Sequence, residues 1–117
     1  MVTLDTIRQL ALKLPEVTEE PHFEKISFRV KNKIFATYNP KTPNAVIKLS
    51  LADQDFFSCA SKKAMYPVEN KWGQQGWTNV DLINMPPEIL EDVVQRAYCI
   101  VAPKKLAEIV KLKNEQL

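Results

Sequence analysis

The sequence predicts an α+β fold of two layers, in which an antiparallel sheet carries its helices mainly on one face. Two observations predict it. Segments that alternate polar and apolar residues, as half-buried strands do, cluster between residues 25 and 50 and are separated by short turns. Segments with helical periodicity lie before and after this cluster. The expected order is α-β-β-β-α-(β)-β-α, where the strand in parentheses belongs to the less regular stretch after the second helix.

Length and composition indicate a single domain over residues 1–117, with a frayed polar tail at 111–117. A chain with 45% hydrophobic and 26% charged residues is an ordinary globular protein and not a disordered one. No apolar run approaches the ~20 residues that span a bilayer. The first residues lack the basic and apolar regions of a signal peptide. We therefore expect a cytoplasmic protein without a membrane partner, as a monomer or weak dimer.

The first expected element is a helix that begins after Thr3, a residue type that caps helix N-termini. It ends before Pro15, because the residue before a proline is disfavoured in the helical conformation. Residues 16–24 are expected to form a polar, acidic connection. The apolar positions at helical spacing are Leu4, Ile7, Leu10, Ala11 and Leu14.

Three strands are expected next, as an antiparallel meander over residues 25–30, 33–38 and 45–50. The dipeptide Lys31-Asn32 supplies a two-residue turn between the first two strands. This turn would place Phe28 opposite Phe35. A cluster of turn residues over 40–44 separates the second strand from the third.

The second half of the chain is expected to contain two longer helices and a strand. The first helix begins at Ser50 or Asp53 and buries Phe56, Phe57 and Ala60. Residues 77–82 alternate as a strand does. A long amphipathic helix follows Pro86-Pro87 and is broken at Pro103, before a last short helical stretch. Its expected core positions are Ile89, Leu90, Val93, Val94, Ala97, Tyr98 and Val101.

The residue types that carry most catalytic and metal chemistry are scarce. The one histidine, His22, has no serine or cysteine nucleophile associated with it in the sequence. The two cysteines, Cys59 and Cys99, lie in different segments without the close spacing of zinc ligands, and we expect both to be buried free thiols. We therefore expect no enzyme activity, no catalytic or metal site and no cofactor.

The charges are segregated along the chain, although the net charge is only +2. Residues 25–52 contain six basic residues and no acid, and an acidic stretch at 16–24 precedes them. On the expected hairpin, Lys25 and Arg29 point the same way and the turn adds Lys31 and Lys33. Such a basic wing would neutralise nucleic-acid phosphates and release counterions. The alternative is that these cations keep an exposed hairpin soluble and protect its edge.

The loop over residues 71–77 is the second candidate site. It contains both glycines of the chain, two tryptophans and Lys71. Trp72 would either stack on a nucleic-acid base, as aromatic residues of single-strand-binding proteins do, or pack in the core, and the sequence leaves both open. Trp77 is expected in the core because it heads an alternating strand. Lys48 would add positive charge from the neighbouring strand.

Several short segments, in this order and spacing, resemble the MmcQ/YjbR family over about residues 4–110. Ala97 stands where the family usually has serine, and Lys31-Asn32 stands where glycine is common. The resemblance implies a compact, bacterial-type two-layer domain, likened to double-wing DNA-binding folds and to secretion-chaperone-like folds. It also implies DNA binding, by which members of the family are often described. The segments that carry the resemblance are 11–19, 28–30, 33–36, 76–82, 97–101 and 104–106.

The function expected from the sequence is therefore non-enzymatic nucleic-acid binding, with DNA as the partner and a basic β-hairpin wing as the contact surface. The alternative is an adaptor or chaperone-like module that binds a protein or peptide through the sheet or an edge strand. The residues expected to contact nucleic acid are Lys25, Arg29, Lys31, Lys33, Lys48, Lys71 and Trp72.

Overall fold

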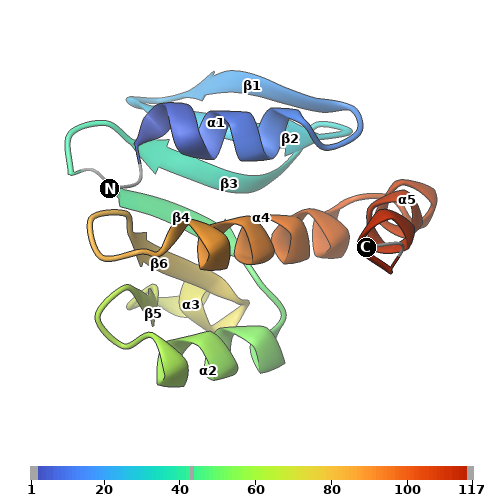
Figure 1. Ribbon diagram of the computed structural model, residues 1–117. Coiled ribbons are helices and arrows are strands. Elements are labelled where there is room, and N and C mark those ends of the chain that lie inside the picture. The colour runs from blue at the N-terminus through green and yellow to red at the C-terminus, as the bar shows by residue number, and fades with distance from the viewer. Residues whose placement is uncertain (1–2, 43, 116–117) are drawn as a thin grey trace.

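The computed structural model describes residues 3–42 and 44–115, and it forms a six-stranded antiparallel sheet with helices packed on it (Figure 1). The strand order is β1-β2-β3-β4-β6-β5, and every neighbouring pair is antiparallel. This confirms the predicted α+β class. The elements are α1 (Leu4–Leu12), β1 (Val17–His22), β2 (Lys25–Val30), β3 (Lys33–Asn39), β4 (Asn44–Lys48), α2 (Leu51–Ala60), β5 (Met65–Pro67), α3 (Lys71–Gln74), β6 (Trp77–Asp81), α4 (Pro87–Val101) and α5 (Lys104–Glu115).

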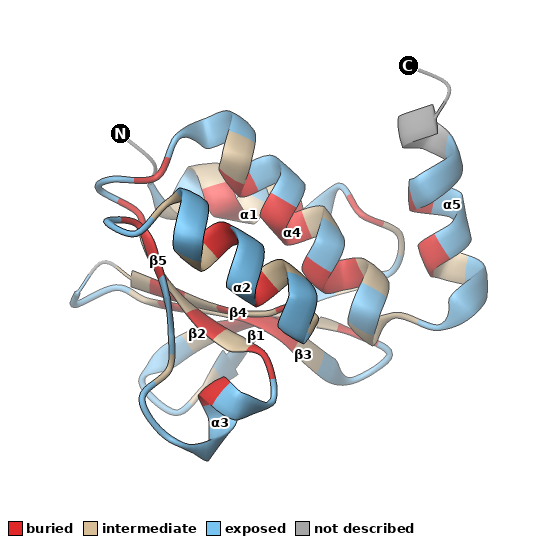
Figure 2. Ribbon diagram, turned by 90° about the horizontal axis from the view of Figure 1, so that it is seen from below, coloured by how far each residue is buried: buried red, intermediate tan, exposed pale blue. Residues whose placement is uncertain are grey.

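The helices α1, α2 and α4 lie together on one face of the sheet, whereas the short helix α3 lies on the other side (Figure 2). We call the sheet face opposite α1, α2 and α4 the open face. The predicted arrangement, with helices mainly on one face, is therefore confirmed. Helix α5 follows α4 after Pro103 and packs against its C-terminal end through Ala107 and Val110.

The core fills the space between the sheet and this helical layer. Alternation along the strands directs Phe28, Ile47 and Val80 into it, and α4 supplies the predicted apolar stripe, in which Leu90, Val93, Val94, Ala97 and Tyr98 are fully buried. The Tyr98 ring packs edge-to-face on Phe35 with ring centroids 5.8 Å apart. Within residues 3–42 and 44–115, no helix combines the length and apolar character needed to cross a bilayer.

The prediction that residues 16–24 form a connection is wrong, because β1 lies there and pairs with β2 from Val17–Val30 to His22–Lys25. It is an edge strand, a position that tolerates its polar residues and Pro21. Val17 packs against the core, and an ion pair also holds β1 to the helical layer, because Arg8 of α1 donates to Glu19 at 2.6 Å.

The predicted pairing of Phe28 with Phe35 is off by one residue. Phe28 pairs with Ala36 and Arg29 with Ile34, so Phe35 occupies a β-bulge. The turn itself is as predicted, since Lys31 and Asn32 both adopt positive φ (52° and 67°), as a type I′ hairpin turn requires.

Three predictions about the helices are wrong. Helix α2 begins after Ser50 but buries Gln54 and Phe57, while Phe56 and Ala60 are exposed. Cys59, on the same helix, is exposed as well, although it is a free thiol as expected. Residues 111–115 belong to α5 and do not form a frayed tail; residues 116–117 lie outside the described part of the chain.

Candidate functional site

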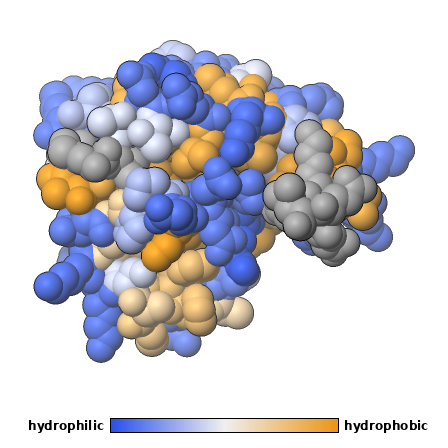
Figure 3. Space-filling model, viewed as in Figure 1, coloured by the Kyte–Doolittle hydropathy of each residue, from blue (hydrophilic) through white to orange (hydrophobic). Residues whose placement is uncertain are grey.

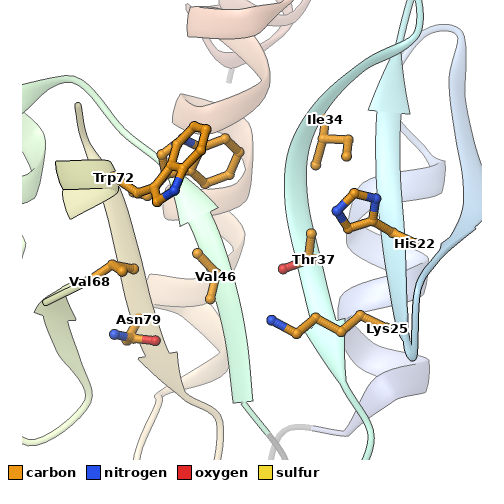
Figure 4. A pocket seen from close by; sticks show the side chains of 9 residues that line it. His22, Lys25, Ile34, Thr37, Val46, Val68, Trp72 and Asn79 are labelled. Carbon is orange, nitrogen blue, oxygen red and sulfur yellow. The ribbon is translucent and has the colours of Figure 1, made fainter. Parts of the chain in front are cut away.

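A cavity of about 510 Å³ lies on the open face of the sheet. It extends from α3 and β6 across the central strands to β1 and β2, so its lining comes from segments far apart in the sequence (Figure 4). Two indole rings and three aliphatic side chains give it apolar walls, and polar side chains lie among them. The lining residues are His22, Lys25, Ile34, Thr37, Val46, Val68, Trp72, Trp77 and Asn79.

Trp72 is 51% exposed, yet the turn that carries it is held firmly. The side chain of Asn70 caps α3 by accepting a hydrogen bond from the Trp72 main-chain nitrogen at 2.9 Å. Gly73 lies so close to the main chain of Val68 that a Cβ would collide with its carbonyl oxygen. Gly76 has φ +105°, a conformation that favours glycine, and packs in the same way against Leu49. These contacts explain why both glycines of the chain stand here.

Gln54 of α2 provides a further attachment for this turn. Its side-chain nitrogen donates to the carbonyl oxygens of Gly73 at 2.9 Å and Trp77 at 3.1 Å, and to the hydroxyl of Thr78 at 3.2 Å. The side chain is buried, so these bonds are shielded from water. A polar residue of the helical layer therefore holds the α3 turn on the far side of the sheet.

Trp77 lies on the open face, not in the core as predicted. Its neighbours Thr78 and Val80 are buried, whereas Trp77 is half-buried and lines the cavity. The ammonium group of Lys48 lies 5.7 Å from the Trp77 ring centroid and donates to the carbonyl oxygen of Gln75. The charge of Lys48 is thus used to hold the loop that follows α3.

The hairpin residues predicted to contact nucleic acid lie in different environments. Lys25 is exposed and lines the cavity opposite Trp72. Arg29 is mostly buried on the open face, where it donates to the Ser27 hydroxyl at 2.9 Å and to the carbonyl oxygen of Pro21 at 3.4 Å. A phosphate would have to compete with these intramolecular bonds for Arg29.

The far end of the hairpin carries Lys31 and Lys33, both exposed. Lys31 forms an ion pair with Glu16 at 2.7 Å, so the acidic stretch does lie beside the basic hairpin. Lys41, in the next turn, similarly faces Glu24 at 3.5 Å. The acidic residues of β1 and its flanks therefore reduce the positive field that the sequence suggests for this hairpin.

The structure brings Lys25 and Trp72 into one cavity and places Lys48 beside it through Trp77. The sequence did not indicate that His22 and Trp77 belong to this site. The alternation of residues 77–81 is the signal that finds Trp77, because it places Trp77 and Asn79 on one face of β6. His22 had no such signal, since its strand was not recognised.

The residues with shifted pKa values lie outside this cavity. Burial raises the pKa of Tyr98 to about 12. Burial also raises the pKa of the Cys99 thiol, partly offset by Lys111. The pKa of Arg96 is raised chiefly by its hydrogen bond to Asp92, and the pKa of Arg8 by its bond to Glu19. Each shift is explained by packing or by an ion pair of the fold.

A second hollow, of about 350 Å³, lies between α2, α4 and α5. The Arg96 side chain lines this hollow and donates hydrogen bonds to Asp53 at 3.1 Å and to Asp92 at 3.0 Å. These three charges are therefore paired within the protein. Among the described residues, no group of three or more His, Cys, Asp or Glu side chains is placed to hold a metal ion.

The fold and the cavity define a small α+β domain whose antiparallel sheet is covered by helices on one face and carries a tryptophan-lined cavity on the other. The model of the YjbR family matches residues 12–100, more than half of the chain, and the protein belongs to this family. The predicted resemblance is thereby confirmed. A search of curated proteins finds no match.

The fold recurs in a solved structure, that of Deinococcus radiodurans protein DR2400, which carries the domain DUF419. The two chains superpose with a TM-score of 0.75 at 24% sequence identity, over 86% of this chain and 79% of that one. At this identity the likeness concerns the fold alone.

Proposed function

We propose that this protein binds nucleic acid, without catalysing a reaction, through the open face of its sheet. The observation that carries the proposal is Trp72, a half-exposed tryptophan on a turn held by two glycine contacts and by Gln54, across a cavity from Lys25. Stacking of a base on an aromatic side chain contributes about 1–3 kcal/mol and needs such a rigid, accessible ring.

Cations around the cavity supply the second component. Lys25 lines the cavity and Lys71 adjoins Trp72, and both are exposed, while Lys33 is exposed at the far end of the hairpin. Phosphates that bind to them release counterions, which gives affinity that falls as salt rises. Because Arg29 and Lys31 already have partners within the protein, the proposal places the main contacts nearer the cavity than a protruding hairpin wing would.

Binding of a peptide is the alternative that the same cavity favours, because Ile34, Val46 and Val68 would also accept an apolar side chain. On the helical side, apolar residues lie in patches separated by hydrophilic ones (Figure 3). Peptide binding driven by apolar burial would change little with salt, so salt dependence separates the two functions.

The test is fluorescence-anisotropy binding of labelled single-stranded and duplex DNA at about 50 and about 200 mM salt. The double variant K25E/K71E is compared with K62E/K63E, which changes the net charge equally but lies at the end of α2, beside a different hollow. We expect K25E/K71E to weaken binding and to lower the salt slope by roughly 1.4–1.8, because each phosphate that is no longer neutralised accounts for ~0.7–0.9.

Three results would refute the proposal. The first is no binding to either DNA at about 50 mM salt, where phosphate-driven binding is strongest. The second is binding that does not change with salt. The third is equal weakening by both double variants, which would show that only the net charge matters.

A further inference from the structure

We infer that the cavity on the open face holds the unpaired bases of a short single strand, and that the strand crosses the sheet from Trp72 to His22 and the neighbouring Phe23. The protein would then be selective for single-stranded over duplex nucleic acid. This inference rests on the proposed nucleic-acid binding and specifies its ligand.

The shape of the cavity carries the first step. Its lining comes from α3 and β6 at one end, from β4 and β3 in the middle, and from β2 and β1 at the other end. Figure 4 shows Trp72 and His22 on opposite sides, with Val46 and Thr37 between them. Strands lie about 4.8 Å apart, so four spacings cover roughly 19 Å. That length accommodates roughly three to six nucleotides, because stacked nucleotides rise about 3.4 Å each and extended ones more.

The chemistry of the walls carries the second step. In a duplex, both faces of each base are covered by its neighbours, so an indole ring can stack only on a base that has left the helix. Duplex DNA is read by elements that protrude into a groove, whereas Trp72 faces into a hollow. The hydroxyl of Thr37 and the amide of Asn79 lie between apolar walls, and such groups form hydrogen bonds with base edges.

The third step concerns the end of the cavity at His22, where the single strand would leave the sheet. Phe23, at the β1–β2 turn, is 94% exposed and has φ 59°, a conformation that is unfavourable for a bulky residue. Its ring meets that of His22 edge-on, with centroids 4.9 Å apart, and His22 lines the cavity. Packing of the protein does not account for an aromatic ring held in solvent on a strained turn. A second stacking surface for a base, about four strand spacings from the Trp72 end of the cavity, does account for it.

The experiment measures binding of labelled oligothymidylates of about 2 to 12 nucleotides, and of a duplex of the longest length, at about 50 mM salt. We expect affinity to rise up to about three to six nucleotides and then to level off, and the duplex to bind at least roughly tenfold more weakly. Trp72→Ala should weaken single-strand binding about 5- to 150-fold, and Trp72→Phe should restore part of the affinity because it keeps an aromatic ring.

A matched pair of surface variants tests the far end of the path. Phe23→Ser and Phe56→Ser each remove an exposed phenylalanine, from the β1–β2 turn beside His22 and from α2 respectively. Neither ring is buried, so both variants should fold. We expect Phe23→Ser to weaken binding of oligomers longer than about three nucleotides and to leave dinucleotide binding unchanged, and Phe56→Ser to have no effect.

Two results would overturn this inference while leaving nucleic-acid binding in place. One is duplex binding as tight as single-strand binding. The other is unchanged affinity in Trp72→Ala and Phe23→Ser while K25E/K71E still weakens binding, which would locate phosphate contacts but no base site. If no oligonucleotide binds at about 50 mM salt, both the inference and the proposed function fail.

Discussion

Gln54 of α2 donates a hydrogen bond through its side-chain nitrogen to the main-chain carbonyl oxygen of Gly73, at 2.9 Å. The bond joins the helical layer to the turn that presents Trp72 on the opposite side of the sheet. Because Gln54 is buried, it acts on Trp72 only through this turn and has no access to a ligand in the cavity.

The first prediction follows from this bond. Gln54→Leu removes the amide and leaves the Gly73 and Trp77 carbonyl oxygens without that donor, which should destabilise the protein by about 1–3 kcal/mol. It should also weaken single-strand binding, since Trp72 loses its fixed position. Urea unfolding and anisotropy binding measure the two effects. Gln9→Leu, on the exposed side of α1, is the control and should stay within about 0.5 kcal/mol of wild type.

The second prediction concerns the ion pair between Lys31 and Glu16. Glu16→Gln removes the negative charge that faces Lys31, so Lys31 becomes available to a phosphate. We expect DNA affinity at about 50 mM salt to rise about two- to fivefold and the salt slope to steepen by up to ~0.9. Glu108→Gln, exposed on α5, makes the same change in net charge and should have less effect. Equal gains in both variants would show that Lys31 has no specific role.

The third prediction concerns pH. Burial raises the pKa of Tyr98 to about 12, whereas tyrosine in an unfolded chain ionises at about 10. The unfolded state therefore loses this proton first, and the stabilisation is complete below about pH 10 and disappears as pH rises to about 12. The contribution is about 2–3 kcal/mol. Urea unfolding from about pH 9 to 12 measures it.

Tyr98→Phe is the control for this pH effect, because it lacks the ionisable group. Its free energy of unfolding should fall less steeply than that of wild type above about pH 10. Below that pH it should be less stable by about 1 kcal/mol or more, since the Pro15 carbonyl oxygen loses the hydroxyl that donates to it at 2.7 Å. If the free energies of unfolding of wild type and Tyr98→Phe fell in parallel above about pH 10, the raised pKa of Tyr98 would be contradicted.

The fourth prediction separates the two cysteines. Cys59 is exposed, whereas Cys99 is partly buried and has a raised pKa, and only the thiolate reacts. A thiol-reactive chromogenic disulfide should therefore label the native protein in two phases at mildly alkaline pH. Cys59→Ser should remove the fast phase and Cys99→Ser the slow one. Disappearance of the fast phase in Cys99→Ser would reverse the assignment.

Much of the fold was predictable because the signals are local. The periodicity of α4 and its bounding prolines identified the helix and its buried face, and the type I′ turn at Lys31-Asn32 joined two recognisable strands. Strand β1 was missed because its sequence, Val17–His22, contains a proline and two adjacent acids and alternates poorly. It forms a strand because β2 offers it a free edge and Arg8 neutralises Glu19.

The candidate site was predictable only in part, because local sequence signals do not show which distant residues lie together. The sequence indicated Lys25 as a surface cation and left Trp72 between an exposed stacking position and the core, and it did not show that the two residues line one cavity. It also placed Arg29 among the free cations, whereas the fold gives that side chain partners in β1 and β2. A residue type can indicate what chemistry a side chain supplies, but its partners are set by packing.

The sequence by itself determined the fold class, the long helices, the meander and the kind of chemistry available, because these depend on propensities and periodicities between residues a few positions apart. Only the tertiary structure decided that the acidic stretch pairs with the basic hairpin, that Gln54 supports the turn of Trp72, and that α3 and the β1–β2 hairpin enclose one cavity. These relationships join residues from about 15 to 50 positions apart, through pairing and burial that depend on the whole fold.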